Sequence, residues 1–386
     1  MSTFEIEIVN TLSGLLALEN DWRALESRLP ALPFVSFDWN VAWWQHLREQ
    51  KLSVTDELAI RTFRSASGEL CAVAPLMLTR RPGVGPMQFR QLQFFGADPN
   101  MTEIRGIAAP DTLRQYVYAD LLEHLQMDRD SWDWLEFSGI PSAPALVSAV
   151  KQRFPDAVWL QDVCDYSLPL APTWAEFKHG LSRNIKESLR KCYNSPKRDG
   201  ITFSIEVART DSEVTAAVEE FLRLHLMRSE LRETTHHNNV FATESARHFL
   251  FDVCLRFAAR DAIRIFQLKI ADKVIATRIG FALGDTLYLY YSGYNPAYSQ
   301  YSIMTTALAE AIQYAIAEGF RSVNLSTGQD VSKDRWSPNH FLYRNAMLVS
   351  PSWRGRVKHR TYSVVRNSLD NLPTTMGLRG LLSRRS

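Results

Sequence analysis

Residues 286–336 read TLYLYYSGYNPAYSQYSIMTTALAEAIQYAIAEGFRSVNLSTGQDVSKDRW, and this stretch decides the fold. Its first part, residues 286–291, has the pattern of a strand and is rich in tyrosine. A polar loop leads to a long helical pattern at residues 302–318, with Ser302 at the N-cap position and a glycine just beyond its end. A short apolar strand at residues 322–326 follows directly. The stretch therefore predicts a strand, a helix that begins in a polar loop, and a second strand.

Two further strands precede this stretch, at residues 264–270 and 274–283, with a tight turn between them. Three consecutive strands joined by tight turns predict an antiparallel meander. Upstream, the patterns predict a strand at 201–207 and helices at 174–191, 214–231 and 244–259, and a final strand follows near 341–349. The C-terminal half is therefore predicted to be α+β, with a mixed, mostly antiparallel sheet flanked by helices.

The N-terminal half repeats this order in a blurred form. Strands are predicted at residues 4–9, 58–64, 70–79, 88–95 and 132–137, with helices at 15–28 and 113–125. The similar order predicts two related α+β domains in tandem. Two prolines within residues 167–173 indicate a linker. The expected domains are residues 1–165, residues 166–350, and a basic helical tail at 351–386.

Composition excludes several classes of protein. The chain has 386 residues, 46% of them hydrophobic, and a net charge of +2, which does not indicate a dedicated nucleic-acid binder. The four cysteines are widely spaced and form no CxxC, so neither a zinc site nor a disulfide framework is predicted, and free thiols favour a cytoplasmic location. His236-His237 are adjacent and predict a polar loop, so no metal is expected. No apolar stretch approaches the length of a membrane span.

The start of the predicted helix at residues 302–318 is a candidate phosphate site. Amide groups at a helix N-terminus are unsatisfied and carry partial positive charge, so the backbone of residues 302–305 can hold a pyrophosphate. The alternative is that Ser302 caps an ordinary surface helix.

Residues 286–336 resemble the core of the CelD/BcsL-like acetyltransferases, a family of the GNAT superfamily related to the Fem aminoacyl transferases. The resemblance rests on the tyrosine-rich strand 288–294, the Gly-Phe-Arg-Ser turn at 319–322, and Thr327-Gly328-Gln329-Asp330 followed by Lys333 and Trp336. Residues 221–228 also resemble the family's Leu-His-x-x-Arg helix. The chain has Tyr301-Ser302 where the family usually has a small residue and glycine.

The resemblance implies a GNAT fold in which the two strands of residues 286–336 splay apart around the arm of acyl-coenzyme A. A backbone amide near Tyr290 and Ser292 would polarise the thioester carbonyl. The phosphate contacts would come from Tyr301, Ser302, Ile303, Met304 and Thr305. No metal is implied.

A tyrosine is suited to protonate the leaving thiolate, and Tyr291 and Tyr294 are the candidates, with Tyr298 and Tyr301 as rivals. The alternative for each of them is ordinary packing.

Four polar residues and one tryptophan complete the predicted site. Asp330 and His225 are candidates to bind or deprotonate the acceptor. Arg228 lies three residues after His225, on the same helix face. Together with Lys333 and Trp336, it is a candidate for substrate binding. The alternatives are a surface ion pair for Asp330 and Lys333, and a buried, hydrogen-bonded histidine.

The sequence therefore predicts an N-acyltransferase that uses acetyl-CoA or another acyl-CoA. The family implies an amino group of a sugar or other small amine as acceptor, with a link to exopolysaccharide or envelope glycan and possible assembly in a polysaccharide-synthesis complex. Two alternatives stay open: a Fem-like transferase that uses aminoacyl-tRNA, and a non-catalytic scaffold, which the Tyr301-Ser302 loop favours.

Overall fold

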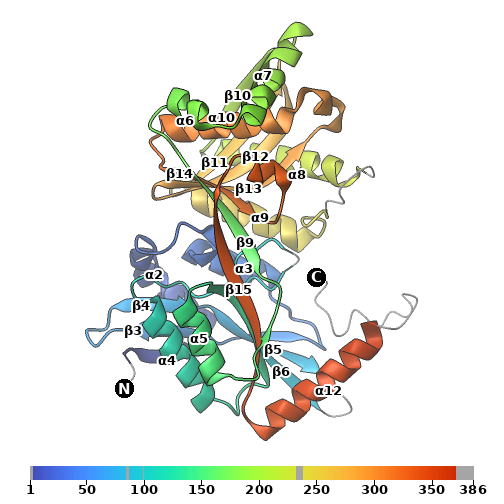
Figure 1. Ribbon diagram of the computed structural model, residues 1–386. Coiled ribbons are helices and arrows are strands. Elements are labelled where there is room, and N and C mark those ends of the chain that lie inside the picture. Colours follow the sequence, from blue (N-terminus) through green and yellow to red (C-terminus); the bar gives the residue numbers. More distant parts are fainter. Residues whose placement is uncertain (1–2, 84–86, 99, 232–237, 371–386) are drawn as a thin grey trace. The chain divides into compact units, whose positions relative to one another are not determined.

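The computed structural model describes residues 3–83, 87–98, 100–231 and 238–370 (Figure 1). The chain divides into two compact units, one made of Met1–Val163 with Leu342–Ser386 and the other of Cys164–Phe341. His236-His237 and residues 371–386 lie outside the described residues. The predicted boundary near residue 165 lies close to the observed one, whereas the chain returns to the first unit at Leu342 rather than continuing to residue 350 in the second.

The second unit is built on a mixed sheet with the strand order β10-β11-β12-β13-β14-β9. Every neighbouring pair described is antiparallel except β13 and β14, which are parallel. The strands are β9 (Val163–Pro169), β10 (Phe203–Ala208), β11 (Ile263–Ile270), β12 (Lys273–Leu283), β13 (Thr286–Tyr294) and β14 (Ser322–Thr327). The antiparallel meander predicted from the tight turns is confirmed as β11, β12 and β13.

Helices cover both faces of this sheet. Figure 1 shows α6 (Trp174–Gly180), α7 (Arg183–Arg198) and α10 (Ile303–Ala317) gathered together, and their apolar side chains share one core with β13, β14 and β9. Helices α8 (Asp211–Ser229) and α9 (Glu244–Ala258) pack on β11, and α8 also packs on β12 and β13. The turns η2 (Pro296–Tyr301) and α11 (Val331–Asp334) lie at the ends of β13 and β14.

The first unit repeats this plan. Its larger sheet has the order β15-β7-β6-β5-β2, again with one parallel pair, β6 and β7, joined through helix α4. The strands are β2 (Thr55–Leu58), β5 (Leu76–Pro82), β6 (Gln88–Phe94), β7 (Trp134–Pro141), β15 (Asn339–Val349) and, beside β15, β8 (Val158–Trp159). A three-stranded sheet adds β1 (Glu5–Val9), β3 (Ile60–Arg64) and β4 (Leu70–Ala74). The helices are α1 (Leu12–Ala17), α2 (Glu19–Glu26), η1 (Pro33–Val35), α3 (Phe37–Leu47), α4 (Arg114–Met127), α5 (Pro144–Arg153) and α12 (Trp353–Asp370).

The two units share the order strand, helix, parallel strand, which confirms the predicted α+β class with mixed, mostly antiparallel sheets. In each unit, a strand from elsewhere in the chain then pairs antiparallel with the second parallel strand. β9, which follows the N-terminal half, pairs with β14, and β15, which follows the C-terminal half, pairs with β7. The strand that completes each sheet therefore comes from a part of the sequence that follows the other half of the chain: β9 follows the N-terminal half, and β15 follows the C-terminal half.

Several predicted elements differ from the observed ones, each for a local reason. The strand expected at 70–79 is two strands in different sheets, because Pro75 between them has no N–H to continue a ladder. The helix expected at 174–191 breaks after Gly180, and a second helix starts at Arg183. The expected linker at 167–173 is strand β9 as far as Pro169, because Tyr166 and Leu168 are buried in the core.

The basic tail is helical through Asp370, and Tyr362 within it packs on Phe89 and Trp134. Its described part therefore contributes to the first unit's fold.

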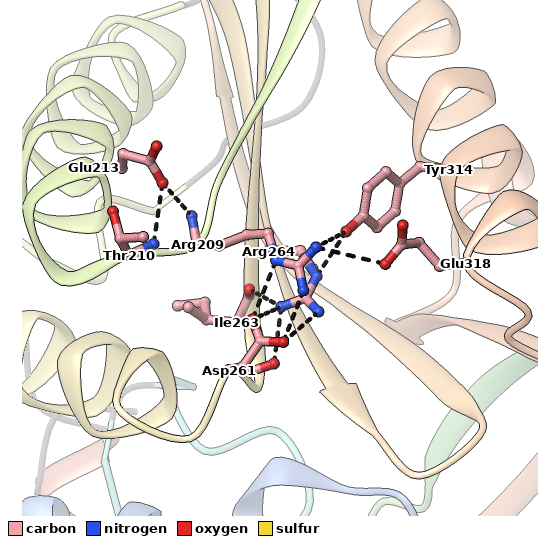
Figure 2. A network of polar contacts seen from close by, with 8 residues as sticks. All are labelled: Arg209, Thr210, Glu213, Asp261, Ile263, Arg264, Tyr314 and Glu318. Carbon is pink, nitrogen blue, oxygen red and sulfur yellow. Dashed lines mark hydrogen bonds and ion pairs between the residues drawn. The ribbon is translucent and has the colours of Figure 1, made fainter.

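A polar network ties the far end of α10 to the rest of its unit (Figure 2). The buried guanidinium of Arg264 donates to the Tyr314 hydroxyl at 2.8 Å and to the Asp261 carboxylate at 3.1 Å. Arg209 donates to the same carboxylate at 2.7 Å and lies 3.5 Å from Glu318. Burying an arginine is costly unless its donors are satisfied, and here they are shared among Ile263 on β11, Asp261 in the turn after α9, and Tyr314 on α10. The network therefore holds the C-terminal half of α10 in place.

Helix α8 approaches β13 so closely that only glycine fits at one position. A methyl group built on Gly293 would lie 2.6 Å from the His225 amide nitrogen and 2.8 Å from the Leu224 carbonyl carbon. Both atoms belong to the helix backbone, so a side-chain rotation cannot relieve the clash. This contact sets the position of His225 and Arg228 over the end of β13.

Replacing Gly293 by alanine is expected to force α8 away from β13 and to lower the free energy of unfolding by about 1–3 kcal/mol, the usual cost of overpacking. Urea denaturation measures this loss. Gly180→Ala is the matched control, because nothing lies within 4 Å of the added methyl group there. Equal stability of the two variants would contradict the close contact.

Candidate functional site

Strands β13 and β14 are paired over a short length only. Their parallel register covers Thr286 with Ser322, Leu287 with Val323, and Tyr288 with Asn324. Beyond these pairs β13 continues to Tyr294 and β14 to Thr327 without further pairing between them in the described register. The two strands are therefore joined by a ladder only at their first residues, and beyond it each strand makes its own contacts.

A β-bulge lies in β13 at the same level. Arg278 pairs with Ser292 and Gly280 with Leu289, so Tyr290 and Tyr291 together face a single residue of β12. The two tyrosine rings meet edge to face with centroids 4.6 Å apart. Tyr290 also contacts Phe281, whereas Tyr291 contacts His225 at 5.7 Å. The bulge therefore turns both rings toward the face of the sheet that α8 covers.

His225 and Arg228 of α8 converge on Ser292. The Nδ1 atom of His225 lies 3.3 Å from the Ser292 carbonyl oxygen. The Nη1 atom of Arg228 donates to that oxygen at 3.4 Å and to the Ser292 hydroxyl at 3.0 Å. Because His225 is buried between aromatic rings, its position is well defined. His225 and Arg228, which were predicted to share one face of a helix, thus both contact Ser292 on strand β13.

Arg228 brings positive charge to the tyrosines of β13. Burial lowers the pKa of its guanidinium, while nearby Tyr294 and Asp330 act in the opposite direction. Its guanidinium carbon lies 5.7 Å from the centre of the Tyr294 ring. Arg228 therefore places a cation beside the aromatic face of Tyr294.

The N-terminus of α10 is formed as the sequence suggests, with one difference. Ser302 occupies the N-cap position, but its backbone is left-handed at φ 55° and its side chain makes no capping hydrogen bond. Its carbonyl accepts from the Thr305 and Thr306 amides at 2.8 and 3.2 Å, so the amides of Ile303 and Met304 precede the first intrahelical bonds. The geometry suits an anion held by backbone.

The loop before α10 is aromatic and ordered by its own contacts. Tyr294, Tyr298, Tyr301 and Met304 pack around the buried side chain of Ile303. The Tyr301 hydroxyl donates to Asp199 at 3.0 Å, and this hydrogen bond raises the pKa of Tyr301. Because a raised pKa makes a poorer acid, Tyr301 is less suited to protonate a thiolate than Tyr291 or Tyr294.

The segment after β14 is organised by Asp330 and Lys333. Asp330 accepts from the Ser332 amide at 2.8 Å as the N-cap of α11. Desolvation opposes ionisation of its carboxyl, but the Ser332 hydrogen bonds and Lys333 lower its pKa overall. The Lys333 ammonium donates to three successive carbonyls, those of Ser326, Thr327 and Gly328. Trp336 is buried in the core with 4% of its surface exposed.

The sequence reasoning missed a buried carboxylate on β9. Asp165 is 3% exposed, and its Oδ2 atom accepts from the Asn324 side chain at 2.8 Å. The Asn324 carbonyl oxygen accepts in turn from the Ser326 amide at 2.7 Å. Burial raises the pKa of Asp165 from 3.8 to about 6, although Asn324 and Lys333 act against this. Asp165 lies at the predicted domain boundary, where no strand was expected, so nothing in the sequence indicated its burial.

In the described part of the first unit, another segment lies against β7 just beyond its parallel pairing. There the parallel pairing of β6 with β7 ends at Gln93 and Glu136. Beyond it, a methyl group built on Gly139 would lie 1.6 Å from the Arg105 carbonyl oxygen, so the segment around Arg105 lies directly against β7. Arg105 also lies 3.3 Å from Glu136. The position between the diverging strands is therefore filled by the chain itself.

A separate cavity of about 460 Å³ lies between α6 and α7. It is lined by Trp174, Ala175, Lys178, His179, Lys186, Leu189, Arg190, Tyr193 and Asn194. It is rich in cations, and it contains none of the residues around β13 and β14 described above.

Residues 182–336 match the family model described as an acetyltransferase (GNAT) domain. This part of the chain is similar to GNAT acetyltransferase domains. The match runs from α7 to Trp336, so the GNAT domain includes α8, the β11–β13 meander, α10 and β14. This confirms the predicted GNAT-type N-acyltransferase. No match is found among the curated proteins.

Solved structures resemble the GNAT domain and the first unit together. A conserved protein of unknown function from Bacteroides thetaiotaomicron VPI-5482 is 12% identical with a TM-score of 0.51, covering 89% of this chain and 100% of its own. FemX is 8% identical with a TM-score of 0.56, covering 88% and 96%. A tandem GNAT protein from the clavulanic acid biosynthesis pathway is 10% identical with a TM-score of 0.43, covering 90% and 99%. The first two alignments support the same fold across both units.

Two further properties concern the described part of the chain only. No helix there is both long and apolar enough to cross a membrane. No group of three or more potential metal ligands comes together there.

The raised pKa of Asp165 predicts a pH-dependent stability. The folded protein binds this proton more tightly than the unfolded chain, so the contribution of Asp165 to stability is full below about pH 4 and is lost as the pH rises through about 6. The difference between 3.8 and about 6 corresponds to roughly 3 kcal/mol. Asp165→Asn removes this loss, so the variant gains stability over the wild type between about pH 4.5 and 7.5.

Urea denaturation of the wild type and of Asp165→Asn at about pH 4.5 and 7.5 measures this gain. The other titrating groups are the same in the two proteins, so their effects cancel in the difference. A stability difference that does not change with pH would show that Asp165 is not desolvated.

Proposed function

We propose that the protein is an acyl-CoA-dependent N-acyltransferase, with acetyl-CoA as the first cosubstrate to test. The observation that carries the proposal is the parting of β13 from β14 directly beside the N-terminus of α10. The pantetheine arm enters between β13 and β14, and the pyrophosphate lies against the amides of Ile303 and Met304, beside Thr305 in the same helical turn. The rest of the phosphate contact comes from Tyr301 and Ser302.

Chemistry takes place at the level of the bulge. A backbone amide near Tyr290 or Ser292 donates to the thioester oxygen, where negative charge develops. His225 and Arg228 hold Ser292 through its carbonyl and hydroxyl, which keeps this edge of β13 in position. Tyr291 or Tyr294, both close to the Arg228 charge, protonates the leaving thiolate. Asp330 and Lys333 border the opposite strand, where the acceptor approaches.

The acceptor is an amino group of a sugar or another small amine. The resemblance of residues 286–336 to the CelD/BcsL-like family supports a role in exopolysaccharide or envelope glycan synthesis, including assembly with other enzymes of that pathway. The four free cysteines fit a reducing compartment, which supports a cytoplasmic enzyme.

Thr305→Glu tests the coenzyme site. A carboxylate in the first turn of α10 repels the pyrophosphate, so the Kd for acetyl-CoA is expected to rise about tenfold or more, as measured by calorimetry. Ala317→Glu adds the same charge at the other end of the helix and is expected to leave the Kd unchanged. Absence of acetyl-CoA binding to the wild type would reject coenzyme use and favour the scaffold.

A Fem-like transferase that uses aminoacyl-tRNA is the second candidate. It is favoured by α7, whose sequence RNIKESLRKCYNSPKR has six basic residues and one acidic residue. Arg190 and Lys191 are exposed on this helix, and Lys178 of α6 lines the same cationic cavity. A helix of this charge can follow a phosphate backbone.

If tRNA is the substrate, it binds with an affinity that falls steeply with salt, and Arg190→Glu with Lys191→Glu weakens it at least tenfold. Fluorescence anisotropy with labelled tRNA measures this. Arg321→Glu, an exposed change away from α7, is the control. Equal weakening by the control, or salt-independent binding, would exclude a tRNA site on α7.

A further inference from the structure

The carboxylate of Asp165 on β9 is an incompletely satisfied buried group of the second unit. It is almost fully buried, and its Oδ1 atom makes no hydrogen bond of ordinary geometry with the described residues, although the Tyr166 amide is near enough to lower the pKa of the carboxyl. A buried carboxylate oxygen without a donor is costly, so native structures rarely keep one without a reason. If this side chain only filled space, an apolar residue of similar size would do so without the cost of burying a carboxylate. Its presence points to a partner that arrives from outside.

The position of Asp165 relates it to the acyl-transfer site. On β9 and β14, the side chains of Tyr166, Leu168, Val323 and Leu325 belong to the core shared with α10. Because side chains alternate along strands, Asp165, Asn324 and Ser326 lie on the other face. That is the face on which Tyr291 contacts His225 of α8. The carboxylate and the bulge tyrosines therefore share one face of the sheet.

The spacing between strands suits an amine between two groups. β9 pairs with β14, and β14 pairs with β13, so β9 lies about 10 Å from β13 across the sheet. A thioester held midway between β13 and β14 lies closer to Asp165 than β13 does, by roughly half the spacing between neighbouring strands. An amine nitrogen placed between the two groups can make a hydrogen bond to the carboxylate and also approach the acyl carbon closely. The sum of these two contacts is about the distance that remains between the carboxylate and the acyl carbon.

Asp165 is also held in a fixed orientation. Asn324 donates to Oδ2 at 2.8 Å and accepts from the Ser326 amide at 2.7 Å. Ser326 adopts a left-handed backbone at φ 69°, a conformation that costs energy for a residue other than glycine. The charged group that acts most on the carboxyl is Lys333, whose ammonium is anchored on the carbonyls at the end of β14. This arrangement leaves Oδ1 as the atom presented to a ligand.

We infer that Asp165 is the group that binds the acceptor's amine and takes its proton, which makes the acceptor a primary amine rather than an alcohol. The inference rests on the proposed acyl transfer. The ammonium first donates to Oδ1 and transfers a proton to the carboxylate. The neutral nitrogen then attacks the acyl carbon, an N–C bond forms, and the C–S bond breaks. The thiolate receives the proton of a tyrosine, and the second amine proton leaves to solvent.

The test uses two nucleophiles with acetyl-CoA and the full chain. Hydroxylamine is unprotonated at neutral pH and needs no base, whereas ethylamine and glucosamine are ammonium ions that do. Asp165→Asn is expected to lower kcat/KM for the ammonium acceptors about 100-fold or more, and to leave hydroxylamine acetylation and acetyl-CoA affinity within about twofold. Asp334→Asn removes an exposed carboxylate after β14 and is expected to change neither.

Each other outcome has a definite meaning. Equal loss with hydroxylamine would overturn the role of Asp165 as a base and indicate a structural one. Wild-type protein that acetylates hydroxylamine but neither amine between about pH 6 and 9 would overturn the amine acceptor. Failure with every nucleophile, together with no acetyl-CoA binding, would reject the proposed function itself. Asn324→Ala, which frees Oδ2, is expected to give a smaller loss with the amines and serves if Asp165→Asn does not fold.

Discussion

The three paired residues that join β13 to β14 are the constraint on which the GNAT domain depends. Parallel pairing at Thr286, Leu287 and Tyr288 brings the two strands and the intervening α10 into one layer. The pairing then stops, and the bulge at Tyr290 and Tyr291 turns β13 further from its neighbour. A longer ladder would satisfy more backbone groups within the sheet. Pairing ends instead after Tyr288 and Asn324, where β13 and β14 take up different partners.

The side chains around this opening are held by contacts on both faces of the sheet. On one face, the apolar core with α7 and α10 fixes β14 and β9. On the other, the glycine contact at Gly293 sets the height of α8, and so the reach of His225 and Arg228. At the far end, the network of Arg209, Asp261 and Arg264 anchors α10. The N-terminus of α10 is thus positioned by interactions that lie away from it.

Each unit has one pair of parallel strands with a helix between them in the sequence, but the surroundings of the two pairs differ. In the first, the chain around Arg105 fills the place where the parallel strands diverge, and Gly139 is needed to admit it. In the second, no described segment takes this place in the ladder of β13 and β14. Within the second unit, β9 pairs with β14 and carries Asp165, and within the first, β15 pairs with β7.

The sequence by itself determined the α+β class, the meander, the helix at 302–318 and the GNAT resemblance, because these depend on local periodicity, turns and caps. It also brought His225 and Arg228 together, since residues three apart share a helix face. It did not predict Asp165, nor the break at Pro75, nor that the supposed linker is a strand. Those depend on which strand pairs with which, and pairing between distant segments leaves no periodic trace. Only the tertiary structure decided which carboxylate is buried and which strands diverge, because burial and register arise from contacts across the whole sheet.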